Sequence, residues 1–303
     1  MKKPLIITIV VVVLLIAGYF MFFRGSSTPA PVTENPTPAT TPANGAAPTQ
    51  SPVVNSEMTV IGQSVQGRDI QAFHYGTGTT EILFVGGIHG GYEWNTALVA
   101  FKLQDYLKKN PSVIPSNVKV TVIPLLNPDG FFKVIGSTSG DFDPALVTTS
   151  QTKLVSGRYN GNGVDLNRNF DCDWQAKGKW QSTTVSGGDS AFSEPESQAM
   201  ESYVTTNKPT AVVVWYSAAG GVYASNCHNG VSTETNALTQ AFAKASGYPA
   251  HQSFDFYATT GDMTNWLAKN SIPAISVLLT NHTDPEWTMN LAGVKAVLNY
   301  YAK

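Results

Sequence analysis

The segment ILFVGGIHGGYEWNTALVAFKLQDYLKK, residues 82–109, places a short apolar run, a glycine-rich loop and an amphipathic stretch in direct succession. The run Ile82–Gly86 predicts a buried strand that ends in glycines. The stretch Tyr92–Lys109 predicts a helix, because its apolar residues recur at helical spacing and Lys108 and Lys109 suit the negative end of a helix. A buried strand followed at once by such a helix indicates an α/β fold.

The same alternation of strands and helices continues to the end of the chain. Further strands are expected at Met58–Ile61, Ile70–His74, Val118–Leu126, Ala211–Tyr216 and Ile275–Leu279. Further helices are expected at Ser193–Val204, capped by Ser193, at Thr233–Ala245 and at Asp284–Ala302 with Glu286 in its first turn. We therefore predict a single α/β domain over residues 56–303, with a central mixed β-sheet flanked by helices. In such sheets, functional groups gather beyond the carboxyl ends of the strands.

The first 55 residues differ in composition from the rest. Pro4–Phe23 carries no charge and follows two lysines, and about 20 apolar residues can cross a bilayer core of about 30 Å. We predict a transmembrane signal anchor over residues 1–24, with a cleaved secretory signal as the alternative. Residues 25–55 are rich in Pro, Thr, Ala and Ser and predict a disordered linker. The domain is then expected to be extracytoplasmic, held at the cell membrane by a single pass.

Composition excludes some partners and leaves the state of the cysteines open. The formal net charge is −2 with 13% charged residues, and no basic cluster of the kind that follows a phosphate backbone is present, so nucleic acid is not an expected partner. Cys172 and Cys227 are the two cysteines of the chain. An oxidising exterior favours a disulfide between them, and two buried free thiols are the alternative.

The loop of the opening segment carries a possible pair of metal ligands. His89 and Glu93 lie just past the predicted strand and are close enough in sequence to reach one ion from a single turn. Imidazole nitrogen and carboxylate oxygen both bind zinc. Taken alone, a His and a Glu in a glycine loop are more often ordinary polar loop residues.

Six segments together resemble the zinc metallocarboxypeptidase family, which has the carboxypeptidase A/B-like fold and includes bacterial members that act on cell-wall peptides. In chain order they are IGQSVQGRDI (61–70), GGIHGGYEWN (86–95), LLNPDGF (125–131), RYNGNGVDLNRNF (158–170), FSEPES (192–197) and YATTGDMTNW (257–266). Their order is the order in the family, and they span nearly all of the predicted domain.

The resemblance implies a role for each matching residue. His89 and Glu93 become zinc ligands, although the family's commonest spacing is one residue shorter. Asn167 and Arg168 match the pair that binds the terminal carboxylate of a substrate, and Arg158 matches the arginine that stabilises the oxyanion. Tyr257 matches the mobile tyrosine that closes over the bound C-terminal residue. Surface salt bridges are the alternative use of the two arginines.

Two positions depart from the family. Its third zinc ligand is a histidine where this chain has Tyr216, and a neutral phenol with a usual pKa of about 10 is a poor ligand. Tyr216 either binds metal in an unusual way or fills the volume of the lost imidazole. The family's general base is a glutamate where this chain has Leu278 or Leu279, neither of which can accept a proton. His282 is expected about 13 Å from Leu278 unless the chain turns back.

These residues support two hypotheses about function, and a purely structural role with the cleft unused is the third alternative. In the first, the protein is catalytically impaired or inactive and binds the C-terminal ends of peptides or peptidoglycan stem peptides, with zinc weak or absent. In the second, it is an active zinc metallocarboxypeptidase with an atypical metal site. Serine chemistry is not indicated, because Ser217 lacks the G-x-S-x-G turn that exposes a nucleophile.

Overall fold

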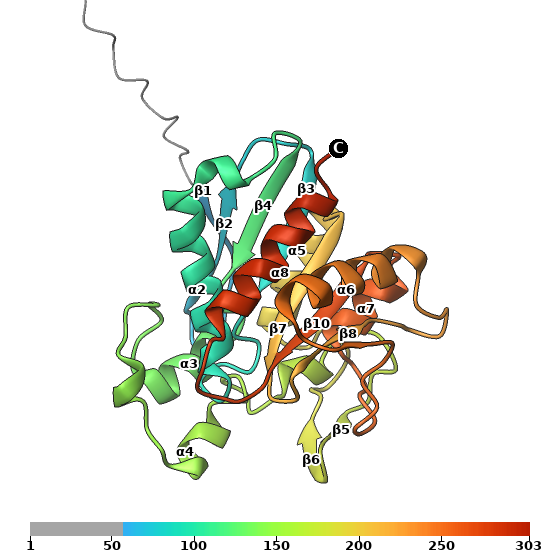
Figure 1. Ribbon diagram of the computed structural model, residues 1–303. Helices are drawn as coiled ribbons and strands as arrows, with labels where there is room; N and C mark the ends of the chain where they lie inside the picture. The colour runs from blue at the N-terminus through green and yellow to red at the C-terminus, as the bar shows by residue number, and fades with distance from the viewer. Residues whose placement is uncertain (1–56) are drawn as a thin grey trace, which may run out of the picture. The chain divides into compact units, whose positions relative to one another are not determined.

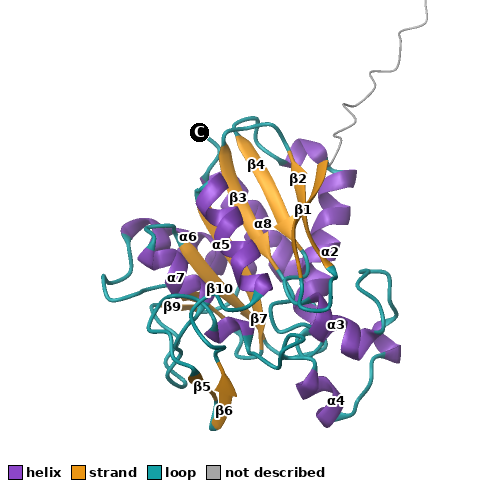
Figure 2. Ribbon diagram, turned by 180° about the vertical axis from the view of Figure 1, so that it is seen from behind, coloured by secondary structure: helices purple, strands orange, loops and turns teal. Residues whose placement is uncertain are grey.

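The computed structural model describes residues 57–303, and Figures 1 and 2 show this part of the chain from opposite sides. The predicted anchor and linker, residues 1–24 and 25–55, lie outside the described residues. Between residues 57 and 303, no helix combines the length and the apolar character that crossing a membrane requires.

A mixed sheet of eight strands forms the centre of the fold, in the order β1-β2-β4-β3-β7-β10-β8-β9. The strands are β1 Glu57–Gln63, β2 Asp69–Tyr75, β3 Thr80–Val85, β4 Val118–Ile123, β7 Ala211–Ser217, β8 Gly221–Ala224, β9 Ala250–His251 and β10 Ala274–Leu279. β4, β3, β7 and β10 run parallel to one another, whereas β1, β2 and β8 join by antiparallel pairing. β7 is buried along its whole length, as its β-branched run requires for a strand covered on both faces.

Helices cover both faces of the sheet. They are α2 Trp94–Lys109, α3 Pro128–Ile135, α4 Gln151–Ser156, α5 Pro195–Asn207, α6 Thr233–Ser246, α7 Met263–Lys269 and α8 Trp287–Tyr300. Apolar residues of α2, α6 and α8 pack on one face, and those of α5 and α7 pack on the other. β5 Lys177–Trp180 and β6 Thr183–Ser186 form a separate hairpin.

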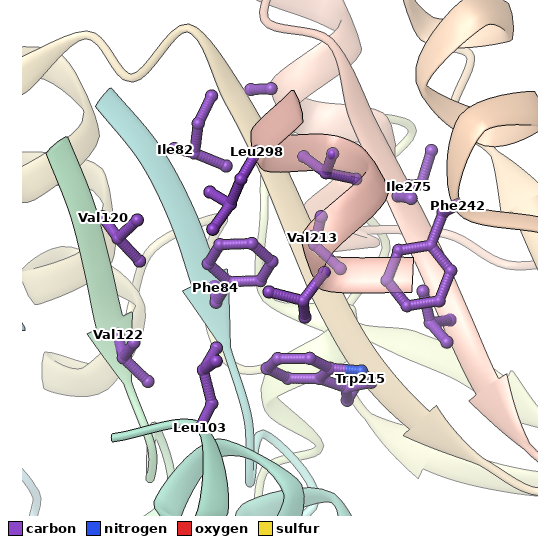
Figure 3. Packing of buried hydrophobic residues seen from close by; sticks show 14 of the residues in the cluster. Ile82, Phe84, Leu103, Val120, Val122, Val213, Trp215, Phe242, Ile275 and Leu298 are labelled. Atoms are coloured by element: carbon purple, nitrogen blue, oxygen red, sulfur yellow. The ribbon is translucent and has the colours of Figure 1, made fainter. Parts of the chain in front are cut away.

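The core on the α2, α6 and α8 face is built around large side chains from the middle of the sheet (Figure 3). The rings of Phe84 and Trp215 stack with their centroids 5.6 Å apart, and Phe242 of α6 and Leu298 of α8 belong to the same cluster. Each such side chain contributes about 1.5–3 kcal/mol when it is fully buried. The indole nitrogen of Trp215 donates to Asn290 at 2.9 Å, so its buried polar atom has a partner. This packing holds the ends of β3, β7 and β10 in fixed positions.

The fold class predicted from the sequence is confirmed. Several helices and strands, however, begin or end at other residues than predicted. β4 stops at Ile123, because Pro124 follows and cannot donate to the ladder. Ser193 does not cap α5. The N-cap residue is Glu194, without a side-chain cap bond, and Pro195 begins the helix. Glu286 precedes α8 as its N-cap residue rather than lying in its first turn.

Cys172 and Cys227 form a disulfide, with their Cα atoms 6.2 Å apart. This result decides between the two alternatives that the sequence left open. The bridge connects the segment that follows Arg168 to the segment that follows β8. Arg168 and Asn226, which lie near the two cysteines in the sequence, line the pocket described below.

Candidate functional site

A pocket of about 210 Å³ lies at the carboxyl ends of β7 and β10. All but one of the residues that the resemblance singled out line it, namely His89, Arg158, Asn167, Arg168, Tyr216, Tyr257 and Leu278. Glu93 is the exception and lies buried behind His89. Segments that are far apart in the sequence therefore meet at the edge of the sheet where an α/β fold places its functional groups.

His89 lies between two carboxylates in the loop that joins β3 to α2. Its Nδ1 is 3.0 Å from Oε1 of Glu93, and its Nε2 is 3.3 Å from Oδ1 of Asp165. The other Glu93 oxygen accepts a hydrogen bond from the backbone nitrogen of Ser217 at 3.0 Å. Burial raises the pKa of Glu93, but His89 and Arg158 outweigh it and hold that pKa below its usual range. Glu93 therefore carries a negative charge beside the imidazole of His89.

The loop reaches this geometry through a glycine in the left-handed region. Gly90 has φ of 45°, and a Cβ at this position would lie 2.7 Å from the carbonyl oxygen of Gly157. Glycine meets both demands, because it tolerates positive φ and needs no room for a side chain. The turn after β3 can therefore pack closely against the segment that leads to Arg158.

Arg158 is neutralised by a neighbouring carboxylate. Its Nε and Nη2 donate to the same oxygen of Asp165 at 2.9 and 2.7 Å. Burial opposes the charge on Asp165, but Arg158 and then His89 lower the pKa of that carboxyl far below its usual range. The guanidinium also lies 4.5 Å from the ring of Trp180, so it is held from two sides. The resemblance did not single out Asp165, although its place within VDLNRNF was visible in the sequence.

Arg168 has a different environment. It is 1% exposed, and its guanidinium donates to the carbonyl oxygens of Lys179 and Asn167 at 2.6–2.9 Å. Among residues 57–303, no carboxylate forms an ion pair with it. A buried charge normally requires a partner of opposite sign. The pocket wall therefore carries a positive charge that neutral carbonyl groups position and do not cancel.

Asn167 connects this wall to the start of α7. Its Nδ2 donates to Asp262 at 2.9 Å, and its Oδ1 accepts from the backbone nitrogen of Met263 at 3.1 Å. The same oxygen accepts from the hydroxyl of Tyr216 at 3.2 Å. One Nδ2 hydrogen remains for a ligand, because an amide nitrogen has two.

Tyr216 and Leu278 are register partners on the parallel strands β7 and β10. Leu278 lines the pocket, whereas Leu279 belongs to the core on the opposite face, so of the two leucines Leu278 is the one that fits the general-base position implied by the resemblance. Burial, followed by Asp262 and Glu93, raises the pKa of Tyr216 well above 10. Tyr216 is therefore a neutral phenol that donates to Asn167.

The side chains at the edge of the pocket do not complete the zinc site that the resemblance implies. Such a site needs three protein ligands and an open position. His89 and Glu93 are present, and neutral Tyr216 stands where the third would be. In the described part of the chain, no group of three or more His, Cys, Asp or Glu side chains could hold a metal ion. The donor set present therefore does not fit the ion.

His282 contacts a residue of the pocket, because the chain turns back as the sequence allowed. The chain turns back after β10, and Nδ1 of His282 lies 2.8 Å from Oγ of Ser217. The turn is held by Asn95, whose Nδ2 donates to the carbonyl oxygens of Asn281 and Asp284. The distance of about 13 Å from Leu278 was expected only if the strand continued straight, whereas residues 280–283 bend.

Comparison with known proteins identifies the family. The family model for zinc carboxypeptidases matches residues 51–293. The chain belongs to the zinc carboxypeptidase family. The chain is 26% identical over 253 residues to the gamma-D-glutamyl-L-diamino acid endopeptidase 1 of Lysinibacillus sphaericus. This match covers 75% of the chain and 61% of that protein.

Solved structures share the fold. The murein-tripeptide amidase MpaA of Escherichia coli O157 has a TM-score of 0.57 at 21% identity, covering 81% of this chain and 92% of that one. Carboxypeptidase A from Helicoverpa armigera has a TM-score of 0.63 at 18% identity, covering 83% and 70%. These structures have an α/β fold with a central mixed sheet flanked by helices, as does this member of the zinc carboxypeptidase family.

Proposed function

We propose that this protein binds the free C-terminal carboxylate of peptides, including peptidoglycan stem peptides, and is catalytically impaired or inactive as a peptidase. The observation that carries the proposal is the guanidinium of Arg168, which is buried in the pocket wall without an ion-pair partner among residues 57–303. A carboxylate entering the pocket supplies that partner. Arginine suits this task because its planar guanidinium can bind both carboxylate oxygens.

Neighbouring groups complete the proposed carboxylate site. The free Nδ2 hydrogen of Asn167 offers a further donor beside Arg168. The ring of Tyr257 lies 6.0 Å from the guanidinium carbon of Arg168 and can cover the ligand from the open side. Thr264, which donates to Asp262 and pairs with Ser276, lies in the pocket wall where the side chain of the bound residue would go. The groups that hold an anionic terminus are therefore present together.

The groups that would activate water are different in this chain. A general base must accept the proton of the attacking water, a role worth about 10²–10⁴-fold in rate, and Leu278 cannot do so. Tyr216 is neutral and directed at Asn167. We therefore propose that zinc binds weakly or not at all and that peptide hydrolysis is lost or strongly reduced.

Two relatives support a cell-wall peptide as the ligand. One is named as a gamma-D-glutamyl-L-diamino acid endopeptidase and the other as a murein-tripeptide amidase. This chain spans 61% of the length of the former, so its own ligand remains a proposal. We also propose that residues 1–24 anchor the protein in the cell membrane, that residues 25–55 form a linker, and that the domain over residues 56–303 faces the extracytoplasmic side.

The proposal is tested with a pair of peptides that differ at one end. Acetylated peptides with a free C-terminal carboxylate and the same peptides with a C-terminal amide are titrated into the protein by calorimetry. We expect the acid to bind more tightly by about tenfold to a hundredfold, because a hydrogen-bonded charge contributes about 1.5–3 kcal/mol. Equal binding of acid and amide would contradict the proposal.

A further inference from the structure

The two-stranded hairpin β5–β6 contacts both arginines of the site. Figures 1 and 2 show the hairpin extending away from the central sheet. The carbonyl oxygen of Lys179 in β5 accepts from Nε and Nη2 of Arg168 at 2.9 and 2.7 Å. The ring of the next residue, Trp180, lies 4.5 Å from the guanidinium of Arg158. The hairpin lies between two of the six segments that carry the family resemblance, which gives it no role.

The contact with Lys179 determines which edge of the Arg168 guanidinium is free for a ligand. A guanidinium has five N–H groups, one on Nε and two on each terminal nitrogen. Nε and Nη2 donate to Lys179, and Nη1 donates to the carbonyl oxygen of Asn167. Within residues 57–303 these three bonds leave one hydrogen on each terminal nitrogen. Such a pair of N–H groups matches the two oxygens of a single carboxylate.

Gly178 allows the hairpin to come this close to Arg168. A Cβ at position 178 would lie 2.8 Å from Cδ of Arg168 and 3.1 Å from its Cγ, which is nearer than non-bonded carbon atoms pack. Any side chain at this position would therefore displace either β5 or the arginine. Glycine meets the demand for a close backbone approach, so the stem of Arg168 can lie directly against the strand.

The base of the hairpin is joined to the segment that carries Arg168. The carbonyl oxygen of Ser186 in β6 accepts from the backbone nitrogen of Asp165 at 3.0 Å. The carbonyl oxygen of Gly187 accepts from Nδ2 of Asn169 at 2.6 Å. The hairpin and the segment Asp165–Asn169 therefore hold each other in place, and the orientation of Arg168 depends on both.

We infer that the β5–β6 hairpin is the positioning element of the carboxylate pocket, by which we mean the pocket at the carboxyl ends of β7 and β10. Gly178, Lys179 and Trp180 do not line this pocket. The hairpin acts through Arg168, because it binds one edge of the guanidinium and leaves the other edge to one carboxylate of the ligand. This inference rests on the proposed function and deepens it, because it assigns the preference for a terminal carboxylate to the hairpin as well as to the arginine.

The variant Gly178→Ala tests this inference. The peptide acid and the peptide amide of the previous experiment are titrated into the natural protein and the variant. We expect the preference for the acid over the amide to fall about tenfold, because a displaced guanidinium loses one charged hydrogen bond to the carboxylate. The affinity for the amide should not change.

Thr184→Ala is the matched control for this variant. Thr184 lies opposite Lys179 in the same hairpin and is exposed. Its hydroxyl accepts from Nζ of Lys179, and that bond is also exposed. This variant should therefore retain the full preference for the acid. A loss as large as that of Gly178→Ala would indicate a general disturbance of the hairpin and would overturn the inference.

Two variants of Trp180 provide a second test, which decides the matter if Gly178→Ala does not fold. Trp180→Ala removes the ring from Arg158, so the end of β5 loses a contact and the preference for the acid should fall at least about threefold. Trp180→Phe keeps an aromatic ring there and should restore the preference. Circular dichroism of each variant shows whether it is folded.

The remaining outcomes separate this inference from the proposed function. Equal binding of acid and amide by the natural protein would overturn both. A natural protein that prefers the acid, together with a folded Gly178→Ala variant of unchanged preference, would overturn the inference alone. If Gly178→Ala does not fold, an unchanged preference in Trp180→Ala would do the same. A parallel loss of affinity for acid and amide would show that the hairpin only supports the fold, and would also overturn the inference.

Discussion

At the scale of single residues, Arg158 and Arg168 show why identical side chains in one motif have different uses. Both are buried, but Arg158 donates two hydrogen bonds to Asp165 and Arg168 donates only to backbone carbonyls. An isolated charge in the interior is costly unless a ligand or a partner compensates it. The sequence could not separate the two cases, because the partners depend on how the chain turns between them.

Arg168→Gln tests the use of the unpaired guanidinium. Glutamine keeps a donor near the carbonyl of Lys179 but has no charge, so the preference for peptide acid over peptide amide should fall to near unity. Arg68→Gln is the matched control, since Arg68 pairs with Asp129 outside the pocket. Titration calorimetry with both peptides measures the preference, and a preference that survives in Arg168→Gln would assign it to another group.

His282 predicts a pH dependence of stability. Burial lowers the pKa of His282 below 6.5, with Glu93 opposing this and His89 and Arg158 adding to it. In the interval between the folded pKa and 6.5, the unfolded chain binds more protons than the folded one at this position. Stability contributed by neutral His282 is therefore full above pH 6.5 and falls as the pH decreases through that interval.

His282→Gln should make the stability curve flatter in this interval. The free energy of unfolding, measured by urea titration at steps between pH 8 and pH 5, should decline less steeply in the variant than in the natural protein. The comparison starts at pH 8, where the charge of His282 does not contribute to the difference. Parallel declines in the two proteins would show that this imidazole is not held neutral by the fold.

At the scale of elements, β7 and β10 bring together the two residues on which the proposed loss of catalysis depends. Their parallel register aligns Tyr216 with Leu278, and burial of β7 on both faces follows from its β-branched run. The sequence predicted both strands closely because their apolar runs are uninterrupted. It left the position of His282 open, because the turn after β10 depends on hydrogen bonds from Asn95, which is distant in sequence.

Asp262, the N-cap residue of α7, connects this helix to Asn167 in the pocket. Asp262 accepts from the backbone nitrogen of Asn265 at 2.9 Å and from the side chain of Asn167 at 2.9 Å. Asp262→Ala should cost about 1–2 kcal/mol of stability and should also weaken peptide binding, because Asn167 loses its support. Thermal unfolding and calorimetry on the same preparation measure the two effects.

Ser232→Ala is the matched cap variant for this experiment. Ser232 caps α6 through the backbone nitrogen of Thr235 at 3.0 Å and does not line the carboxylate pocket. Its loss should cost about 1 kcal/mol and leave peptide binding unchanged. If both variants weaken binding to the same extent, general destabilisation and not the contact between Asp262 and Asn167 is responsible.

At the scale of the whole domain, the order of six motifs was enough to predict the fold, because together they span nearly all of it. The disulfide was left open, since sequence cannot supply the separation of two Cα atoms. The short elements β5, β6, β8, β9, α3, α4 and α7 were also missed, because they are too brief to show a periodic pattern. The hydrogen-bond and ion-pair partners of the site residues could not be predicted, because they come from segments that are distant in the sequence.

The disulfide predicts a large effect on stability. Cys172 and Cys227 are separated by 55 residues, and closing a loop of that length is worth about 4 kcal/mol in the chain-entropy account. The double variant Cys172→Ala/Cys227→Ala should lose about 3–4 kcal/mol in urea unfolding, and thiol reduction of the natural protein should have a similar effect. Unchanged stability in both would show that the bridge does not restrain the unfolded chain.

The most direct measurement of the central claim is hydrolysis of blocked dipeptides together with the zinc content of the purified protein. The natural protein is compared with the double variant Tyr216→His/Leu278→Glu, which restores the family's residues at both positions. Because the natural chain has a neutral phenol and a leucine there, we expect it to contain less than one zinc ion per protein and to show no chelator-sensitive hydrolysis. The double variant should show a higher zinc content and a higher rate of chelator-sensitive hydrolysis. Stoichiometric zinc and chelator-sensitive turnover in the natural protein would contradict the account.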